Sequence, residues 1–101
     1  MGDVNQQLGQ IRGRIDQALS AVEGDKSASP VLTAVVREFS VKAEKASRTA
    51  AAGAERDAVV ELEQAGDSAK AAAEADTGAG EASRKAVLDA HLAICKLKAS
   101  L

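Results

Sequence analysis

Residues 29–75 read SPVLTAVVREFSVKAEKASRTAAAGAERDAVVELEQAGDSAKAAAEA, and no proline follows Pro30. Pro30 suits the first position of a helix, where its missing N–H is not needed, and Ser29 suits the N-cap before it. The apolar residues that follow have the spacing of one helical face: Leu32, Val35, Val36, Phe39, Ala43, Ala46 and Ala50. The pattern predicts one long central helix over about 30–75, with Gly53 and Gly66 as its candidate break points.

The apolar face of this long segment shifts after Ala54. Asp57 and Glu61 take up the earlier face, and the new face consists of Ala58, Leu62, Ala65, Ala69 and Ala72. Repeated four-residue spacings produce such a drift, because an α-helix has 3.6 residues per turn. The two halves are therefore expected to contact different neighbours, with residues 4–22 covering the first half and the C-terminal segment covering the second.

Two shorter amphipathic segments flank the long one. The first, about 3–23, has a narrow apolar face formed by Val4, Leu8, Ile11, Ile15, Leu19 and Val22. The last, about 81–100, has a broader face formed by Val87, Leu88, Ala90, Leu92, Ile94, Cys95, Leu97 and Leu101. The predicted fold is all-α: an elongated helical hairpin or three-helix bundle in a single domain, 1–101. No repeat of 20–50 residues is visible, so a solenoid is not indicated.

The amount of core that such a subunit can build is small. Alanine accounts for 23 residues, and it buries much less surface than leucine or isoleucine. The broad apolar face of the last segment exceeds what one alanine-faced helix can cover, so self-association is expected, most simply as a two-fold dimer. The residues predicted to form the core or the interface are Leu8, Ile11, Ile15, Leu19, Leu32, Phe39, Val60, Leu62, Leu88, Leu92 and Leu97.

Composition argues against several functional classes. The net charge is −2, the 13 basic and 15 acidic residues are interspersed, and Phe39 is the single aromatic residue, so no nucleic-acid partner is predicted. The N-terminal residues lack the basic and apolar regions of a signal peptide, and no apolar run approaches the roughly 20 residues of a membrane span. A soluble protein of the cytoplasm is expected.

His91 and Cys95 are the only residues whose pattern suggests chemistry. They lie four positions apart on one predicted helix, so their side chains can meet. Such a pair is half of a zinc site, and the other half would need Asp or Glu ligands or a two-fold copy, since the chain has no second His or Cys. The simpler interpretation is that both are packing or interfacial residues. No catalytic residue, cofactor or metal is predicted from the sequence.

These patterns favour a non-enzymatic helical module for protein–protein interaction or scaffolding, self-associating through apolar helix faces. In size and alanine-rich helical composition the chain also resembles the WXG100 family, which implies a small helical protein exported without a cleaved signal. The Trp-x-Gly turn and the Tyr-x-x-x-Asp/Glu signal of that family are absent, because the sequence has no Trp or Tyr. A third hypothesis is an amphipathic protein that coats a lipid or polymer surface.

Overall fold

Four helices form nearly all of the structure, a computed structural model that describes residues 3–101. Helix α1 spans Val4–Glu23, α2 spans Pro30–Ala51, α3 spans Glu55–Ala75 and α4 spans Glu81–Ala99. No strand occurs in residues 3–101. The all-α prediction is therefore confirmed, and the ends of both flanking helices lie within one residue of their predicted positions.

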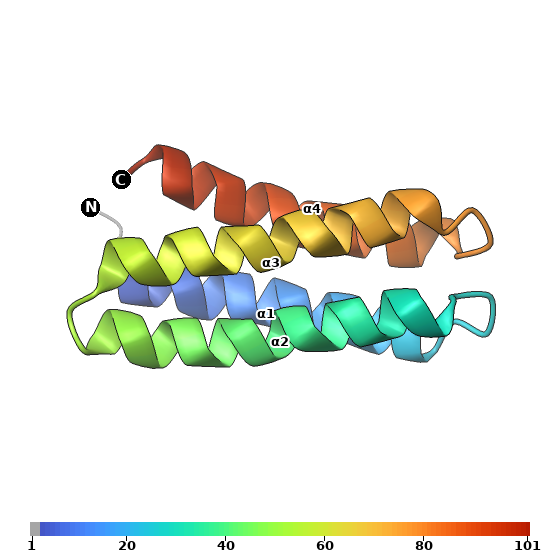
Figure 1. Cartoon of the computed structure of the whole chain (residues 1–101), viewed down its shortest axis with the longest axis horizontal. Helices are drawn as coiled ribbons and strands as arrows, with labels where there is room; N and C mark the ends of the chain where they lie inside the picture. Colours follow the sequence, from blue (N-terminus) through green and yellow to red (C-terminus); the bar gives the residue numbers. More distant parts are fainter. Residues whose placement is uncertain (1–2) are drawn as a thin grey trace.

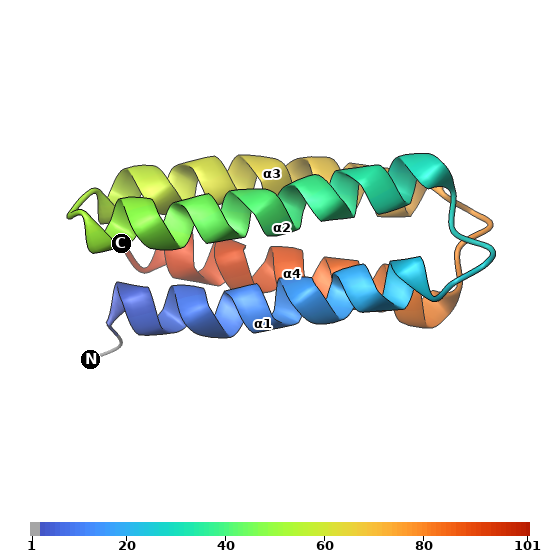
Figure 2. The ribbon, with the colours of Figure 1, turned by 90° about the horizontal axis from the view of Figure 1, so that it is seen from below.

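The helices run alternately up and down and form a four-helix bundle of about 40 × 20 × 18 Å (Figures 1 and 2). Each helix packs against two others, in the cyclic order α1, α2, α3, α4 and back to α1. As predicted, α1 covers α2 and α4 covers α3, and two further interfaces, α2 with α3 and α1 with α4, close the bundle. Across residues 3–101, none of the helices is both long enough and apolar enough to cross a bilayer.

The prediction of one continuous helix over 30–75 is wrong, and the break lies at Gly53, one of the two candidate break points. Helix α2 ends at Ala51 and α3 begins at Glu55, and residues 52–54 reverse the chain. Gly53 has a φ of 101°, the only positive φ among the described residues, and glycine adopts this conformation at little cost. Its N–H donates to the carbonyl of Ala50 at 3.0 Å, which satisfies one of the free carbonyls at the end of α2.

The lengths of the helices explain why the turn is preferred. The four helices have 20, 22, 21 and 19 residues, so each is about 30 Å long and can be covered along its whole length by its neighbours. A continuous helix over 30–75 would extend for nearly 70 Å, and the 30 Å flanking helices would leave much of its apolar surface exposed. The turn allows α2 and α3 to bury their apolar faces against each other as well.

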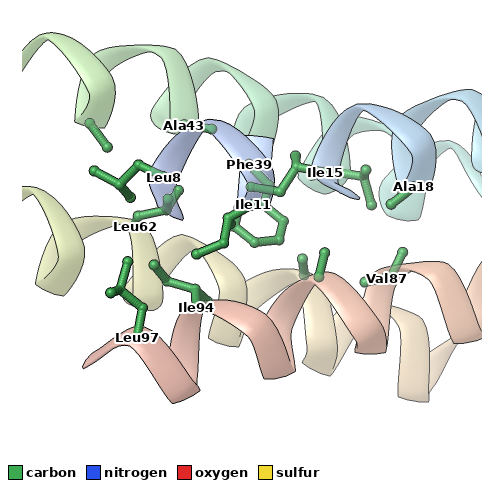
Figure 3. Close-up of a cluster of buried hydrophobic side chains, with 14 of the residues drawn as sticks. Leu8, Ile11, Ile15, Ala18, Phe39, Ala43, Leu62, Val87, Ile94 and Leu97 are labelled. Atoms are coloured by element: carbon green, nitrogen blue, oxygen red, sulfur yellow. The ribbon is translucent and has the colours of Figure 1, made fainter. Parts of the chain in front are cut away.

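The core runs along the axis of the bundle and receives side chains from every helix (Figure 3). Phe39 is completely buried and is the largest of these side chains. Around it, the core combines large side chains with alanines, among them Leu62, Ile94 and Ala43. A full four-helix core therefore forms within one chain, in contrast to the thin subunit expected from three helices.

The two hairpins, α1–α2 and α3–α4, bury corresponding positions: adding 51 to the number of a residue in the first gives its counterpart in the second. Most buried positions of the first hairpin have a buried counterpart 51 residues later, as Leu8 with Val59, Ile11 with Leu62, Ala18 with Ala69, Val36 with Val87, and Phe39 with Ala90. Few of the paired residues are identical, which is why no repeat was visible in the sequence. The two hairpins thus share one pattern of buried positions.

Two aspartates form hydrogen bonds between the α1–α2 loop and the α3–α4 loop. These loops lie at the end of the bundle opposite Gly53, on the right of Figures 1 and 2. One carboxylate oxygen of Asp25 accepts hydrogen bonds from the N–H of Gly80 at 2.7 Å and from the buried Ser83 hydroxyl at 2.8 Å. Asp76 accepts from the N–H of Ser29 at 2.7 Å. Because Gly80 has no side chain that could cap α4, the loop of one hairpin supplies a capping group to the other. We call these two reciprocal interactions the aspartate clasp.

Because the aspartate clasp depends on two ionised carboxylates, we expect the folded chain to lose stability in acid. The N–H of Gly80 lowers the pKa of Asp25 below its usual 3.8, and the N–H of Ser29 does the same for the pKa of Asp76. Because each pKa is lower in the folded than in the unfolded chain, this stabilisation is complete above about pH 5 and is lost as the pH falls through the folded pKa values. We expect the melting temperature, followed by circular dichroism, to fall from about pH 5 to pH 2.

A double variant, Asp25→Asn with Asp76→Asn, tests this assignment. It should melt at a lower temperature near pH 6 and should show a weaker dependence on pH than the wild type. Asp57→Asn, which removes an exposed carboxylate from the first turn of α3, serves as the control and should keep the acid dependence. An unchanged melting profile in the double variant would show that the clasp does not stabilise the fold.

Candidate functional site

The residues predicted to form the core or the interface occupy three environments. Seven are buried in the bundle: Leu8, Ile11, Ile15, Leu32, Phe39, Leu62 and Leu97. Leu19 is partly buried against the core, Val60 and Leu88 are also partly buried, and Leu92 is 51% exposed. Of the broad apolar face predicted for the last segment, one side therefore completes the core and the other side faces outward.

The outward side, here called the outer α4 face, consists of Leu88 and Leu92. Their spacing of four residues places them on one side of α4, away from the core residue Ile94, whereas Cys95 of the same broad face lies against His91 on the side of α3. Beside Leu92 the surface is hollowed between α4 and α1, where the lining residues are Arg14, Asp89, Leu92, Ala93 and Lys96. An aliphatic side chain and a hollow thus lie next to each other on this face.

Three potential metal-binding side chains meet at the junction of α3 and α4: Asp67, His91 and Cys95. The His91 Nε2 atom lies 2.7 Å from Asp67 Oδ1 and 3.4 Å from Cys95 Sγ. The donor atoms of the three residues all lie within 4.8 Å of one another. His91 and Cys95 do meet as their spacing indicates, and α3 adds a carboxylate that the sequence pattern did not identify.

Gly66 creates the space in which the His91 ring lies. A Cβ atom at Gly66 would be 3.3 Å from His91 Cδ2 and 3.2 Å from Phe39 Cζ, closer than ordinary packing allows. The His91 side chain is only 15% exposed because it lies in this space, whereas Asp67 is 60% exposed. Gly66 was a candidate break point, yet α3 continues through it, and its missing side chain instead accommodates the imidazole.

The equivalent location in the first hairpin lacks this arrangement. Counting back 51 residues gives Asp16, Ser40 and Glu44, with Ile15 in the place of the glycine. The Ser40 hydroxyl donates to Asp16 at 3.1 Å, so the polar contact between neighbouring helices is present in both halves. The imidazole, the thiol and the glycine occur only in the second, which makes this the place where the two halves differ most in chemistry.

Nearby charges affect the Cys95 thiol. Burial raises the pKa of Cys95 above its usual 9.0, and the carboxylates of Glu63 and Asp67 raise it further, while Lys70 and Lys98 act in the opposite direction. Lys98 also forms an ion pair with Glu63 at 3.1 Å. The thiol is consequently protonated at neutral pH unless a cation binds beside it.

This geometry does not suit a nucleophilic triad. In such a triad the histidine contacts the acid through one ring nitrogen and the nucleophile through the other. Here Asp67 and Cys95 both lie closest to Nε2, and the Sγ to Nδ1 distance is longer, at 3.9 Å. The raised pKa of Cys95 also disfavours the thiolate that would attack. A thiol, an imidazole nitrogen and a carboxylate that converge on one point are instead donors for a cation.

No protein-family model, curated protein or solved structure matches the sequence. Two residues of this region, Asp67 and Gly66, were not identified as partners of His91 from the sequence, because they belong to another helix. The sequence alone carried no signal for this contact, because the shift of 51 residues that aligns Asp67 with Asp16 becomes visible only from the buried positions of the structure.

Proposed function

We propose that this chain is a non-enzymatic helical interaction module that self-associates through the outer α4 face. The observation that carries this proposal is Leu92, which is 51% exposed although α4 already supplies Val87, Ala90, Ile94 and Leu97 to a complete core. Val31 and Val41 are also more than half exposed, so exposure alone does not single out Leu92. What supports Leu92 is its place on the broad apolar side of α4, one turn from the partly buried Leu88 and beside the hollow between α4 and α1.

The shape of this face favours a second copy as the partner. In a two-fold dimer the same surface meets itself, so a projecting side chain and a hollow must lie side by side on one subunit. Leu92 and the hollow between α4 and α1 satisfy this requirement. With the axis near Leu92, each leucine enters the hollow of the other copy and contacts Ala93 there.

The charges along α4 are compatible with such an antiparallel pairing. Asp89 precedes Leu92 by three residues and Lys96 follows it by four. A two-fold axis near Leu92 therefore brings Asp89 of one copy close to Lys96 of the other, and the reverse. Exposed ion pairs contribute little affinity, but opposite charges at these positions favour this register over others.

Substitution of Leu92→Lys is expected to abolish self-association without unfolding the bundle. Light scattering from low to high micromolar concentration should give a wild-type mass that rises from 10.3 kDa towards twice that value. The variant should remain a monomer throughout, because a lysine would have to be buried beside Lys96. Its circular dichroism spectrum and melting temperature should stay close to those of the wild type.

Val41→Lys is the matched control, since Val41 is 55% exposed and lies on the outer side of α2. It should dimerise like the wild type. A wild-type chain that stays monomeric at every concentration would overturn the proposal. A dimer that survives Leu92→Lys would show that another surface is responsible.

A further inference from the structure

We propose that Asp67, His91 and Cys95 form a binding site for one divalent transition-metal ion, with Zn²⁺ the ion that best fits the donors. The site lies within a single chain and does not depend on self-association through α4. The sequence interpretation of His91 and Cys95 as packing residues left out the carboxylate that α3 contributes.

The chemistry of the three donors selects the class of ion. Zn²⁺ accepts thiolate, imidazole and carboxylate ligands, and open zinc sites commonly have three protein ligands. Mg²⁺ and Ca²⁺ prefer oxygen ligands and would gain little from a thiol and an imidazole. Asp67 is 60% exposed, so a fourth position on the outer side is accessible to water.

The two donor separations that involve His91 are close to those of a zinc site, and all three donors lie within 4.8 Å of one another. Bond lengths of about 2.0–2.3 Å imply separations of about 3.3–3.6 Å between the donors of a tetrahedral zinc ion. The His91 Nε2 to Cys95 Sγ distance, 3.4 Å, already lies in this range. The Nε2 to Asp67 Oδ1 distance, 2.7 Å, must increase by less than 1 Å, and the exposed Asp67 side chain is free to rotate.

All three donors are carried by regular helices. Asp67 lies in the middle of α3, His91 lies in the middle of α4, and Cys95 lies about one turn later in α4. These two helices pack directly against each other. Gly66 accommodates the imidazole between them, so the position of the ring is set by core packing and not by a loop.

The charges near the site balance a divalent ion. Binding displaces the thiol proton of Cys95 to solvent, and the resulting thiolate together with the Asp67 carboxylate neutralises two positive charges. Glu63 adds negative potential, and Lys70 and Lys98 reduce it. Lys98 is held by Glu63 at 3.1 Å, which limits its repulsion of a bound cation.

Titration of the reduced, metal-free protein with Co²⁺ tests the proposal, since Co²⁺ reports thiolate ligation by its absorption. One Co²⁺ should bind per chain with a thiolate-to-cobalt charge-transfer band, and Zn²⁺ should displace it at an equal stoichiometry. The band should disappear in Cys95→Ser. His91→Ala and Asp67→Asn should each weaken binding by about tenfold or more.

Asp16→Asn is the matched control, because Asp16 occupies the equivalent position in the first hairpin and also contacts the adjacent helix. Its cobalt spectrum and affinity should equal those of the wild type. The proposal is overturned if the wild type shows no thiolate band, if the band persists without His91, or if Asp67→Asn binds no more weakly than Asp16→Asn. A ratio of one ion to two chains would likewise exclude the intrachain site.

The same titration in the Leu92→Lys background separates this site from the proposed function. A monomeric Leu92→Lys chain that binds one Co²⁺ with the wild-type spectrum is the expected result. If binding required the dimer, the Leu92→Lys chain would lose the band, and the site as proposed here would be wrong. If the wild type proved monomeric yet bound Co²⁺, only the self-association proposal would fail.

Discussion

Replacing Phe39 with alanine is expected to lower the free energy of unfolding by about 3–5 kcal/mol. Phe39 is the only aromatic residue and is completely buried, and its ring reaches from α2 to Gly66 on α3. Removal of the ring leaves a cavity that neighbouring alanines cannot fill. Small domains typically have a total stability of about 5–15 kcal/mol, so this single change would remove a large part of it.

Urea unfolding followed by far-ultraviolet circular dichroism is the appropriate measurement, because the chain has no Trp or Tyr to serve as a fluorescent probe. Val41→Ala is the control on the same helix. Its side chain is 55% exposed, and its effect should be within about 0.5 kcal/mol. A loss below about 1 kcal/mol for Phe39→Ala would mean that the ring does not lie in the core as described.

Gly66→Leu is expected to destabilise the bundle by about 1–3 kcal/mol, although leucine is the better helix former. A Cβ atom alone would come within 3.2 Å of Phe39 Cζ and 3.3 Å of both His91 Cδ2 and Ile94 Cγ2. The leucine would therefore have to displace the His91 ring or move α3 away from its neighbours. Urea unfolding measures the loss of stability, and the Co²⁺ titration should show weaker binding as well.

Gly13→Leu provides the contrast, because a Cβ atom at Gly13 on α1 meets no atom within 4 Å. That substitution should stabilise the fold by about 0.5–1 kcal/mol through helix propensity. The two glycine substitutions thus have opposite predicted signs. In a Phe39→Ala background, Gly66→Leu should become less harmful because the leucine can occupy part of the vacated space. Stabilisation by Gly66→Leu in the wild-type background would contradict the proposed role of Gly66.

The sequence predicted the helical class and most helix ends for local reasons. Ser29 and Pro30 mark the start of α2, and the glycines at 78 and 80 lie in the connection before α4. The turn at residues 52–54 could not be predicted as firmly as these helix ends. One glycine within an alanine-rich helix costs only about 1 kcal/mol, and long-range packing of α2 on α3 decides whether the chain turns there.

The candidate metal site was predictable only in part, for a related reason. His91 and Cys95 belong to one helix, and their four-residue spacing is sufficient to bring them together. Asp67 lies 24 residues earlier on another helix, and its distance to His91 depends on the register between α3 and α4. That register is set by core residues such as Leu62 and Ile94, which carry no information about the polar contact beside them.

The left-handed turn at Gly53 connects two similar hairpins that pack on each other, and this arrangement also specifies a second way to satisfy the same contacts. If residues 52–54 were helical, α2 and α3 would form one rod of nearly 70 Å, and the two hairpins of a chain would be held apart. A second chain in the same open form would then supply the missing hairpin at each end. The long helix suggested by the sequence is the geometry of such a domain-swapped dimer, and the glycine turn favours the closed single chain over it.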